Sequence, residues 1–349
     1  MPENLLIVRT DRIGDVVLSL PLAGIVKKHL PDCRITFLLR EYTKQLGESH
    51  PFIDDIIILK EEDGKIPLWK NVEKIKKRNF DACIVVYPTF ITALIIFLSR
   101  IKIRVGTGYR WYSSLFNRKV YVHRKYGEKH ELEFNVELLQ EIGIEETVSK
   151  TSVSFNLKPG DKEKQEIRKI FEETGISGNK PVIIVHPGSG GSAVDLPLIK
   201  FKELIELLTS RTDAQVILTG SKNETDLCSE LVISEKVKNF AGRLNLSQLI
   251  ALIDAADIFV ANSTGPIHIA AALGKYTIGF YPHILACSSR RWGPYSEKSY
   301  VFSPENDCAD CRREQCEHTN CMNTIKVTDI FVRIEKICKL IVNNGEFNG

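Results

Sequence analysis

The sequence lacks the patterns that mark several large classes of protein. It contains no apolar run long enough to cross a membrane, because the longest, Phe90–Leu98, is about half the length that a bilayer requires. It has no internal repeat and no low-complexity stretch. Residues 1–4 lead directly into a short apolar strand, without the basic and long apolar regions of a secretory signal, so we expect a cytoplasmic protein.

An excess of one charge is also absent over the chain as a whole. The net charge of the 349 residues is only +3 and no recognition motif is present, so we expect no nucleic-acid partner. Hydrophobic residues make up 43% of the chain, which excludes disorder and allows cores for two domains. The segment from Arg100 to Lys129 is the exception, with nine basic residues and Glu128 as its one acid. It is either a solvated basic face or a surface for an anionic partner.

Two common nucleotide-binding fingerprints are missing as well. No Gly-Lys-Ser/Thr closes a Walker loop, and no G-x-G-x-x-G pattern opens a helix. A different glycine-rich turn, residues 186–191, follows the apolar strand at 182–185. Its glycines let the backbone approach a ligand closely, and the Ser189 hydroxyl adds a polar group there.

A second turn of this kind follows the apolar strand at 258–261. Ser263 or Thr264 can cap the helix that comes next, and Pro266 stands where a first-turn N–H is dispensable. The N–H groups of Thr264 and Gly265, with the helix dipole behind them, would point at an anion. An ordinary strand-to-helix turn is the alternative. Together the two turns favour a nucleotide diphosphate over NAD or ATP.

The nine cysteines fall into two groups. Five lie in apolar elements and are typical of small core residues in a reducing compartment: Cys33, Cys83, Cys228, Cys287 and Cys338. The other four are closely spaced: Cys308, Cys311, Cys316 and Cys321. They indicate a small structural zinc site, with redox-variable disulfides or an unliganded loop as the alternatives.

Apolar strands alternate with amphipathic helices along both halves of the chain. This rhythm predicts α/β domains with parallel sheets, whose ligands bind at the carboxyl ends of the strands. The polar stretch after residue 145 separates the two halves. We predict a first domain at 1–155, a second at 156–325 that includes the cysteine-rich loop 308–321, and a last helix in 326–349.

Three segments together resemble a known family. They are the opening Leu5–Pro21 with its Arg-Thr-Asp-Arg-Ile-Gly-Asp sequence, the middle Val185–Ser189, and Asn262–His268. In order and spacing they are similar to the ADP-heptose:lipopolysaccharide heptosyltransferases, glycosyltransferase family nine. The resemblance covers most of the chain, and Arg291–Pro294 and the cysteine-rich loop also fit it.

The resemblance implies a GT-B fold: two Rossmann-like doubly wound domains facing a central cleft, an acceptor domain first and a nucleotide-sugar domain second, with a final helix that returns to the first. It also implies inverting transfer without a metal cofactor, and the chain has no D-x-D triplet for a divalent ion. By itself Asp15 is a common helix-start acid. The family pattern makes it the general base on the acceptor hydroxyl.

The family pattern also assigns the donor site. It implies that Ser189 and the amides of Thr264 and Gly265 bind the diphosphate, that Glu224 binds ribose, and that the backbone of Leu244 lies near adenine. A solvated acid and a core residue are the alternatives for the last two. His268 is read as a helix histidine rather than a catalyst.

Three positions depart from the family. Many members have a lysine and a tryptophan where this chain has Val194 and Leu196, and many have an acid at the position of Ser263, which we include among the donor-binding residues. These changes leave the donor sugar open.

The expected activity is transfer of heptose or a related sugar from an ADP-sugar to a lipid-linked, anionic saccharide such as a lipopolysaccharide core. A nucleotide-sugar epimerase and a non-catalytic nucleotide-sugar-binding protein are the alternatives. Within the basic segment we expect Arg104, Arg110 and Arg118 to bind the acceptor. Lys119 and Lys125 would hold the protein on the anionic inner membrane.

Overall fold

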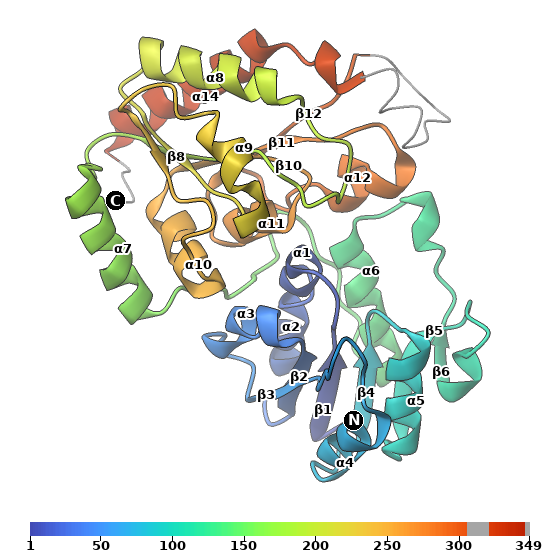
Figure 1. Cartoon of the computed structure of the whole chain (residues 1–349). Coiled ribbons are helices and arrows are strands. Elements are labelled where there is room, and N and C mark those ends of the chain that lie inside the picture. The colour runs from blue at the N-terminus through green and yellow to red at the C-terminus, as the bar shows by residue number, and fades with distance from the viewer. Residues whose placement is uncertain (306–320, 346–349) are drawn as a thin grey trace. The chain divides into compact units, whose positions relative to one another are not determined.

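The computed structural model describes residues 1–305 and 321–345 and divides the chain into two α/β units (Figure 1). The first unit comprises residues 1–124 and 129–157, and the second comprises residues 125–128 and 158–349. Each unit has its own six-stranded sheet, in which every neighbouring pair of strands is parallel. The α/β class predicted from the alternating pattern is therefore confirmed.

In the first unit the sheet has the order β3-β2-β1-β4-β5-β6. Its strands are β1 (Asn4–Val8), β2 (Arg34–Leu39), β3 (Asp55–Ile58), β4 (Ala82–Val85), β5 (Ile103–Thr107) and β6 (Arg118–Val120). Its α-helices are α1 (Ile13–Val17), α2 (Pro21–His29), α3 (Gln45–Glu48), α4 (Leu68–Lys76), α5 (Phe90–Leu98) and α6 (Glu131–Glu137).

Both faces of this sheet are covered, as a parallel sheet requires. Leu6 and Val8 of β1 belong to a core cluster that contains the buried apolar residues of α4 and α5. Leu5 and Ile7 point to the opposite face, because side chains alternate along a strand, and they are fully buried too. The uninterrupted apolar sequence of β1 follows from this double burial.

The helical pattern of residues 14–30 predicts one long helix, but the chain forms two helices there. α1 ends after five residues, and α2 begins with Pro21 in its first turn. Proline has no N–H to donate and suits a helix start, so the chain begins a new helix there. The break leaves Asp15 on a short, separate helix directly after the first strand.

In the second unit the sheet has the order β12-β11-β10-β7-β8-β9. Its strands are β7 (Val182–His186), β8 (Gln215–Leu218), β9 (Val237–Asn239), β10 (Ile258–Asn262), β11 (Tyr276–Phe280) and β12 (Ser299–Phe302). Its described α-helices are α7 (Asp161–Thr174), α8 (Leu198–Arg211), α9 (Thr225–Ser229), α10 (Leu246–Ala255), α11 (Gly265–Ala272), α12 (Ser289–Trp292) and α14 (Val327–Asn344).

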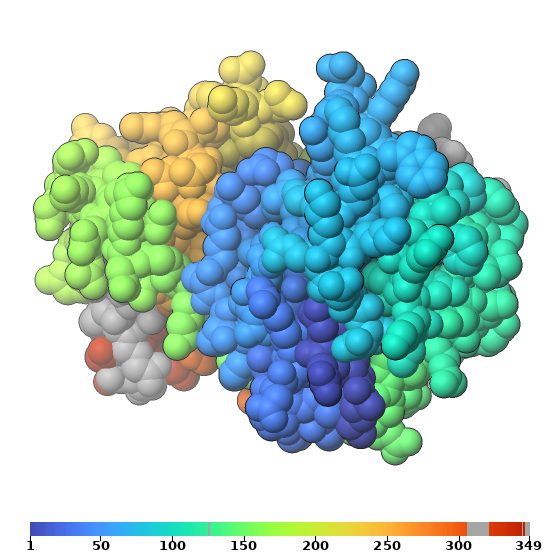
Figure 2. Space-filling model, turned by 90° about the horizontal axis from the view of Figure 1, so that it is seen from below, coloured from blue at the N-terminus to red at the C-terminus, as the bar shows by residue number. Residues whose placement is uncertain are grey.

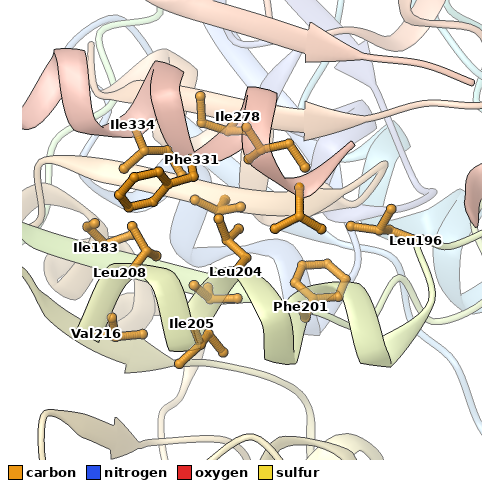
Figure 3. Close-up of a cluster of buried hydrophobic side chains, with 14 of the residues drawn as sticks. Ile183, Leu196, Phe201, Leu204, Ile205, Leu208, Val216, Ile278, Phe331 and Ile334 are labelled. Carbon is orange, nitrogen blue, oxygen red and sulfur yellow. The ribbon is translucent and has the colours of Figure 1, made fainter. Parts of the chain in front are cut away.

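One face of this sheet packs under α8 and α14. Figure 3 shows Phe201, Leu204 and Leu208 of α8 beside Phe331 and Ile334 of α14, all in one buried cluster with residues of the strands. The apolar face of α14 thus has its partner in the second unit. The predicted return of this helix to the first domain stays a prediction, as do the predicted domain boundaries.

Strands β6, β9 and β12 were not expected from the sequence. They are three or four residues long, and two of them, β6 and β12, contain no fully buried residue. All three lie at sheet edges. Short edge strands with one neighbour have little apolar periodicity, which is why the pattern did not reveal them.

The cysteines that the structure describes differ in their burial. Cys33, Cys83, Cys228 and Cys338 are buried as predicted, while Cys287 is half-buried.

In the cysteine-rich loop, Cys308, Cys311 and Cys316 lie outside the described residues, so the zinc prediction is not tested at those positions. Cys321 is buried in the core cluster of the second unit. Within residues 1–305 and 321–345 no group of three or more histidine, cysteine or acidic residues is placed to hold a metal ion.

Candidate active site

The carboxyl end of β1 carries a buried ion cluster built around Arg9. This side chain is 1% exposed. Its Nε donates to Asp11 Oδ1 at 2.7 Å, and its Nη2 is hydrogen-bonded to Asp15 Oδ1. The sequence alone predicted only Asp15 here. The structure shows that Asp15 shares one guanidinium with a second carboxylate four residues earlier.

Helix α6 contributes the remaining partners of Arg9. Arg9 Nη1 lies 3.5 Å from Asn135 Oδ1 and 3.7 Å from Glu131 Oε1. Arg124 binds the same two side chains, with Nη1 3.0 Å from Asn135 Oδ1. The Asn135 amide in turn donates to the Leu18 carbonyl at 3.1 Å. The cluster therefore fastens the first turn of the sheet to a helix more than 100 residues later in the chain.

Burial changes the ionisation of this cluster. Burial raises the pKa of the Asp11 carboxyl to about 7. The positive charge of Arg9 lowers this pKa, but the negative charge of Asp15 raises it, in the same direction as burial. Burial alone would lower the pKa of Arg9, but the neighbouring charges of Asp11, Asp15 and Glu131 raise it well above its usual range. Arg9 is thus a permanent cation, and Asp11 is the group that titrates near neutral pH.

The glycine-rich turn after β7 has the backbone of an anion site. Gly190 and Gly191 have φ angles of 56° and 75°, in the left-handed region that glycine adopts without strain. Ser189 is buried, and its Oγ has no hydrogen-bond partner among the described residues. A buried hydroxyl without a partner costs free energy unless a ligand satisfies it.

Asn262, at the end of β10, fixes this turn from the side. Its side chain is fully buried. Its Nδ2 donates to the Pro187 carbonyl at 2.6 Å, and its Oδ1 accepts the Leu196 N–H at 2.8 Å. Because β7 and β10 are neighbours in the sheet, one amide holds both ends of the loop between Pro187 and Leu196.

The turn after β10 leads into α11. Thr264 is the N-cap residue, with no side-chain hydrogen bond to cap the helix, and Gly265 and Pro266 form its first turn. Ser263, Thr264 and Pro266 are buried. Ser263 also makes a side-chain hydrogen bond to Tyr281, whose hydroxyl donates to the Trp292 carbonyl at 3.0 Å. The positive end of α11 therefore has no side-chain acceptor of its own at the N-cap, as an anion site requires.

Glu224 lies behind the glycine-rich turn. Its Oε2 accepts the Ser221 N–H at 2.7 Å. Burial alone would raise its pKa, but hydrogen bonds from Ser221 and the Gly190 N–H, with the nearby His186, lower it. A Cβ at Gly188 would come within 1.9 Å of Glu224 Oε1. The carboxylate is thus already in use as a support for the turn, and its contact with ribose stays a prediction.

His186 is the partner of Glu224 that the sequence did not single out. It is buried at the end of β7, with Nδ1 3.0 Å from Thr219 Oγ1. Burial lowers its pKa to about 4, against the opposing effect of Glu224. The imidazole is therefore neutral at neutral pH and acts as a hydrogen-bonding group under the turn.

The other donor positions are found around the same sheet edge. Leu244 is half-buried and follows Gly242, whose N–H donates to the Gly220 carbonyl at 2.9 Å in the loop after β8. Val194 and Leu196 are buried in the core cluster. The chain thus uses as core residues the two positions where many family members have a lysine and a tryptophan. His268 is buried within α11, as a helix histidine should be.

Sheet order explains why the predicted donor residues come together. Ser189, Glu224, Leu244 and Ser263–Gly265 follow β7, β8, β9 and β10, which are adjacent strands in the order β10-β7-β8-β9. Carboxyl ends of parallel strands meet at one edge, which is where ligands bind in such sheets. The single sequence motifs are thus parts of one surface.

The three arginines proposed for the acceptor differ in their surroundings. Arg104 is half-buried on β5, and its guanidinium donates to the Leu115 and Ile101 carbonyls at 2.9 and 2.6 Å. Arg110 is exposed in the loop after β5, and Arg118 is exposed on β6. Their role in acceptor binding stays a prediction, and Arg104 has a structural role besides.

Solved structures with the same fold define the class of this protein. A glycosyltransferase of family 9 from Veillonella parvula matches with a TM-score of 0.82 and 16% identity, over 96% of this chain and 97% of that one. Escherichia coli heptosyltransferase WaaC with ADP matches with a TM-score of 0.75 and 18% identity, over 96% and 99% of the two chains. The two units are those of the GT-B fold.

The sequence comparisons give the family. The model of glycosyltransferase family 9 (heptosyltransferase) matches residues 68–322. A Haemophilus influenzae protein, provisionally described as a glycosyltransferase, is 31% identical over 86% of this chain and 89% of its own length. The chain belongs to glycosyltransferase family 9 and is a glycosyltransferase. The resemblance identified from its motifs is confirmed.

Proposed function

We propose that the protein transfers heptose, or a related sugar, from an ADP-sugar to a lipopolysaccharide core or another lipid-linked saccharide. Family membership supports the sugar class, and the ADP bound to a solved structure of similar fold supports the nucleotide. The main evidence for the donor site is the buried Ser189 hydroxyl, which has no hydrogen-bond partner among the described residues. It lies in the glycine-rich turn after β7, and β7 is the neighbour of β10, the strand that leads into α11. The buried, unpaired Cys83 and Cys228 fit a reducing cytoplasm.

In the proposed mechanism Asp15 acts as the general base. It accepts the proton of the acceptor hydroxyl while that oxygen forms a bond to the anomeric carbon of the donor. The bond from this carbon to the β-phosphate oxygen breaks, and a single displacement inverts the configuration. Arg9 orients the Asp15 carboxylate from the buried side. About a hundredfold or more in rate is the usual effect of such a base.

The leaving diphosphate needs a positive environment, which the second unit offers without a metal ion. The first-turn N–H groups of α11, the Ser189 hydroxyl and the backbone around Gly190 and Gly191 are donors at one sheet edge. Preorganised donors of this kind stabilise the charge that develops on a leaving group. Exposed Arg110 and Arg118, with Arg104, are proposed to bind the carboxylates and phosphates of the acceptor.

The test of the mechanism is the variant Asp15→Asn. It should retain the fold and bind ADP, yet transfer sugar at least about a hundredfold more slowly than the wild type. Asp11→Asn is the matched control, because it removes a second carboxylate hydrogen-bonded to Arg9, and its loss of rate should stay below about tenfold. Wild-type transfer by Asp15→Asn would remove Asp15 from the mechanism.

The donor site is tested by Gly265→Val. A branched side chain at this position would crowd the amides of the first turn of α11, so ADP affinity should fall by about tenfold or more. AMP, which lacks the β-phosphate, should bind the wild type more weakly than ADP. An unchanged affinity for ADP in the folded Gly265→Val protein would place the diphosphate elsewhere.

A further inference from the structure

Helix α5 exposes apolar side chains on the face that points away from the core. Phe90, Leu94 and Phe97 are spaced i, i+4 and i+7, which places them on one side of the helix. Phe90 and Phe97 are 43% and 42% exposed, and Leu94 is half-buried. The opposite side, with Ile95 and Ile96, is buried in the core of the first unit. A surface helix normally turns polar residues outward, but α5 contains no charged residue at all.

Trp111 extends this apolar face. Its ring packs against the ring of Phe90 with 4.7 Å between the centroids, and the side chain is 78% exposed. We call Phe90, Leu94, Phe97 and Trp111 the aromatic stripe. The segment from α5 to β6, cyan to teal in Figure 2, forms a continuous part of the surface of the first unit.

Cations border the aromatic stripe. The Arg104 guanidinium lies 5.3 Å from the centre of the Phe97 ring and is fixed there by the Leu115 and Ile101 carbonyls. Arg100 is exposed directly after α5, and Arg110 is exposed next to Trp111. The sequence has no aspartate or glutamate from residue 82 to residue 127. The three arginines therefore have no acid close to them in sequence.

We propose that the aromatic stripe and its arginine border form a docking surface for an anionic lipid bilayer. An apolar helix face with aromatic rings and basic neighbours is the composition that lies in the headgroup region. α5 has nine residues, too few to span a bilayer, so it would lie in the plane of the membrane. No helix that the structure describes could itself cross a membrane. The arginines beside the stripe favour anionic lipid over a second copy of this chain, whose own arginines would repel them.

The docking surface rests on the proposed function in one respect, since it would bring the protein to the membrane that holds the proposed lipid-linked acceptor. The residues that form it all lie in the first unit. The experiment therefore uses the full chain and vesicles, without donor or acceptor. A chain that transfers sugar to a water-soluble acceptor yet ignores vesicles would overturn only the docking surface. A chain that docks but transfers nothing would overturn only the proposed activity.

The chain has three tryptophans, which makes Trp111 its own probe. In the Trp69→Phe/Trp292→Phe protein only Trp111 fluoresces. With vesicles of phosphatidylcholine and phosphatidylglycerol whose chains are brominated, we expect its emission to be quenched at low salt, and much less at high salt or with phosphatidylcholine alone. The matched control is the Trp111→Phe/Trp292→Phe protein, which reports from Trp69 on α4, also exposed, at 65%. It should be quenched less.

Two substitutions then test the surface itself. Phe97→Ser should lower vesicle binding by about tenfold, and Arg100→Ala by about fivefold, the usual effect of one cation near an anionic surface. Lys162→Ala in the second unit, also exposed, should change nothing. Thermal unfolding establishes that each variant is folded. Equal quenching of Trp69 and Trp111, binding without regard to lipid charge, or a dimer in solution that Phe97→Ser dissociates would each overturn the proposal.

Discussion

Replacing Arg9 by methionine removes the buried cation that Asp11 and Asp15 share. The methionine fills a similar volume, so the change is mainly one of charge. Arg9 is completely buried, and its loss leaves two carboxylates facing each other without a counter-ion, while Glu131 keeps Arg124. Breaking a buried ion pair on one side costs about 3–5 kcal/mol. We expect the first unit to lose stability by that amount at pH 8.

The loss should be smaller at acid pH. The folded-state pKa of Asp11 is raised to about 7, so the folded chain binds a proton there that the unfolded chain does not hold between about pH 4 and pH 7. In wild type this group makes stability fall as the pH rises through that window. Without Arg9 the Asp11 pKa rises further, so the penalty of Arg9→Met grows between pH 5 and pH 8.

Urea unfolding followed by tryptophan fluorescence gives the measurement. In a Trp292→Phe background the remaining Trp69 and Trp111 both lie in the first unit, so the signal reports that unit. Arg78→Met is the control, since Arg78 is 45% exposed and pairs with Asp55 at the surface, where about 0–1 kcal/mol is expected. If Arg9→Met costs no more than Arg78→Met, or costs more at pH 5 than at pH 8, the reasoning about the cluster is refuted.

Two further predictions concern the second unit. Gly188→Ala should displace the Glu224 carboxylate, because the new Cβ would lie 1.9 Å from its Oε1. The expected cost is about 1–3 kcal/mol of stability, together with weaker ADP binding. The double variant with Glu224→Ala should regain the stability because the clash is gone. Asn262→Ala should leave the Pro187 carbonyl and the Leu196 N–H unpaired, at a cost of about 2–4 kcal/mol. Asn262→Asp keeps the acceptor for Leu196 and should be unable to donate to Pro187. Urea midpoints check these stabilities, and a stable Asn262→Ala protein with full ADP affinity would show that the amide does not hold the turn.

The strands and turns could be predicted because they depend on residues that are consecutive in the sequence. The strands with double-sided burial, such as β7 and β10, are largely apolar runs, and the turns after them contain the serine, glycine and proline that their backbones need. These local signals were enough to predict the α/β class and the two anion turns. The family pattern then assigned Asp15 its role, which a lone acid at a helix start would not have revealed.

What could not be predicted are contacts between residues far apart in the chain. Glu131 and Asn135 stand more than 100 residues after Arg9, and nothing in α6 marks them as its partners. The sequence marks Asn262 only as the first residue of the segment Asn262–His268, although its amide reaches Pro187, 75 residues earlier. Such pairs depend on sheet order, and the sequence pattern gives strands without their order.

The support of the glycine-rich turn also bears on how specificity can change within such a protein. Asn262 holds the loop at Pro187 and Leu196, and Glu224 holds it at Gly190, so its path is set by side chains from neighbouring strands. Neither anchor involves Val194, which packs in the core cluster of the second unit where many relatives have a lysine. Exchange of Val194 for a charged residue would therefore disturb the core under the loop, while Asn262 and Glu224 still held the path of the turn. A lineage or an engineer that changed this position would have to repack the neighbouring core residues as well.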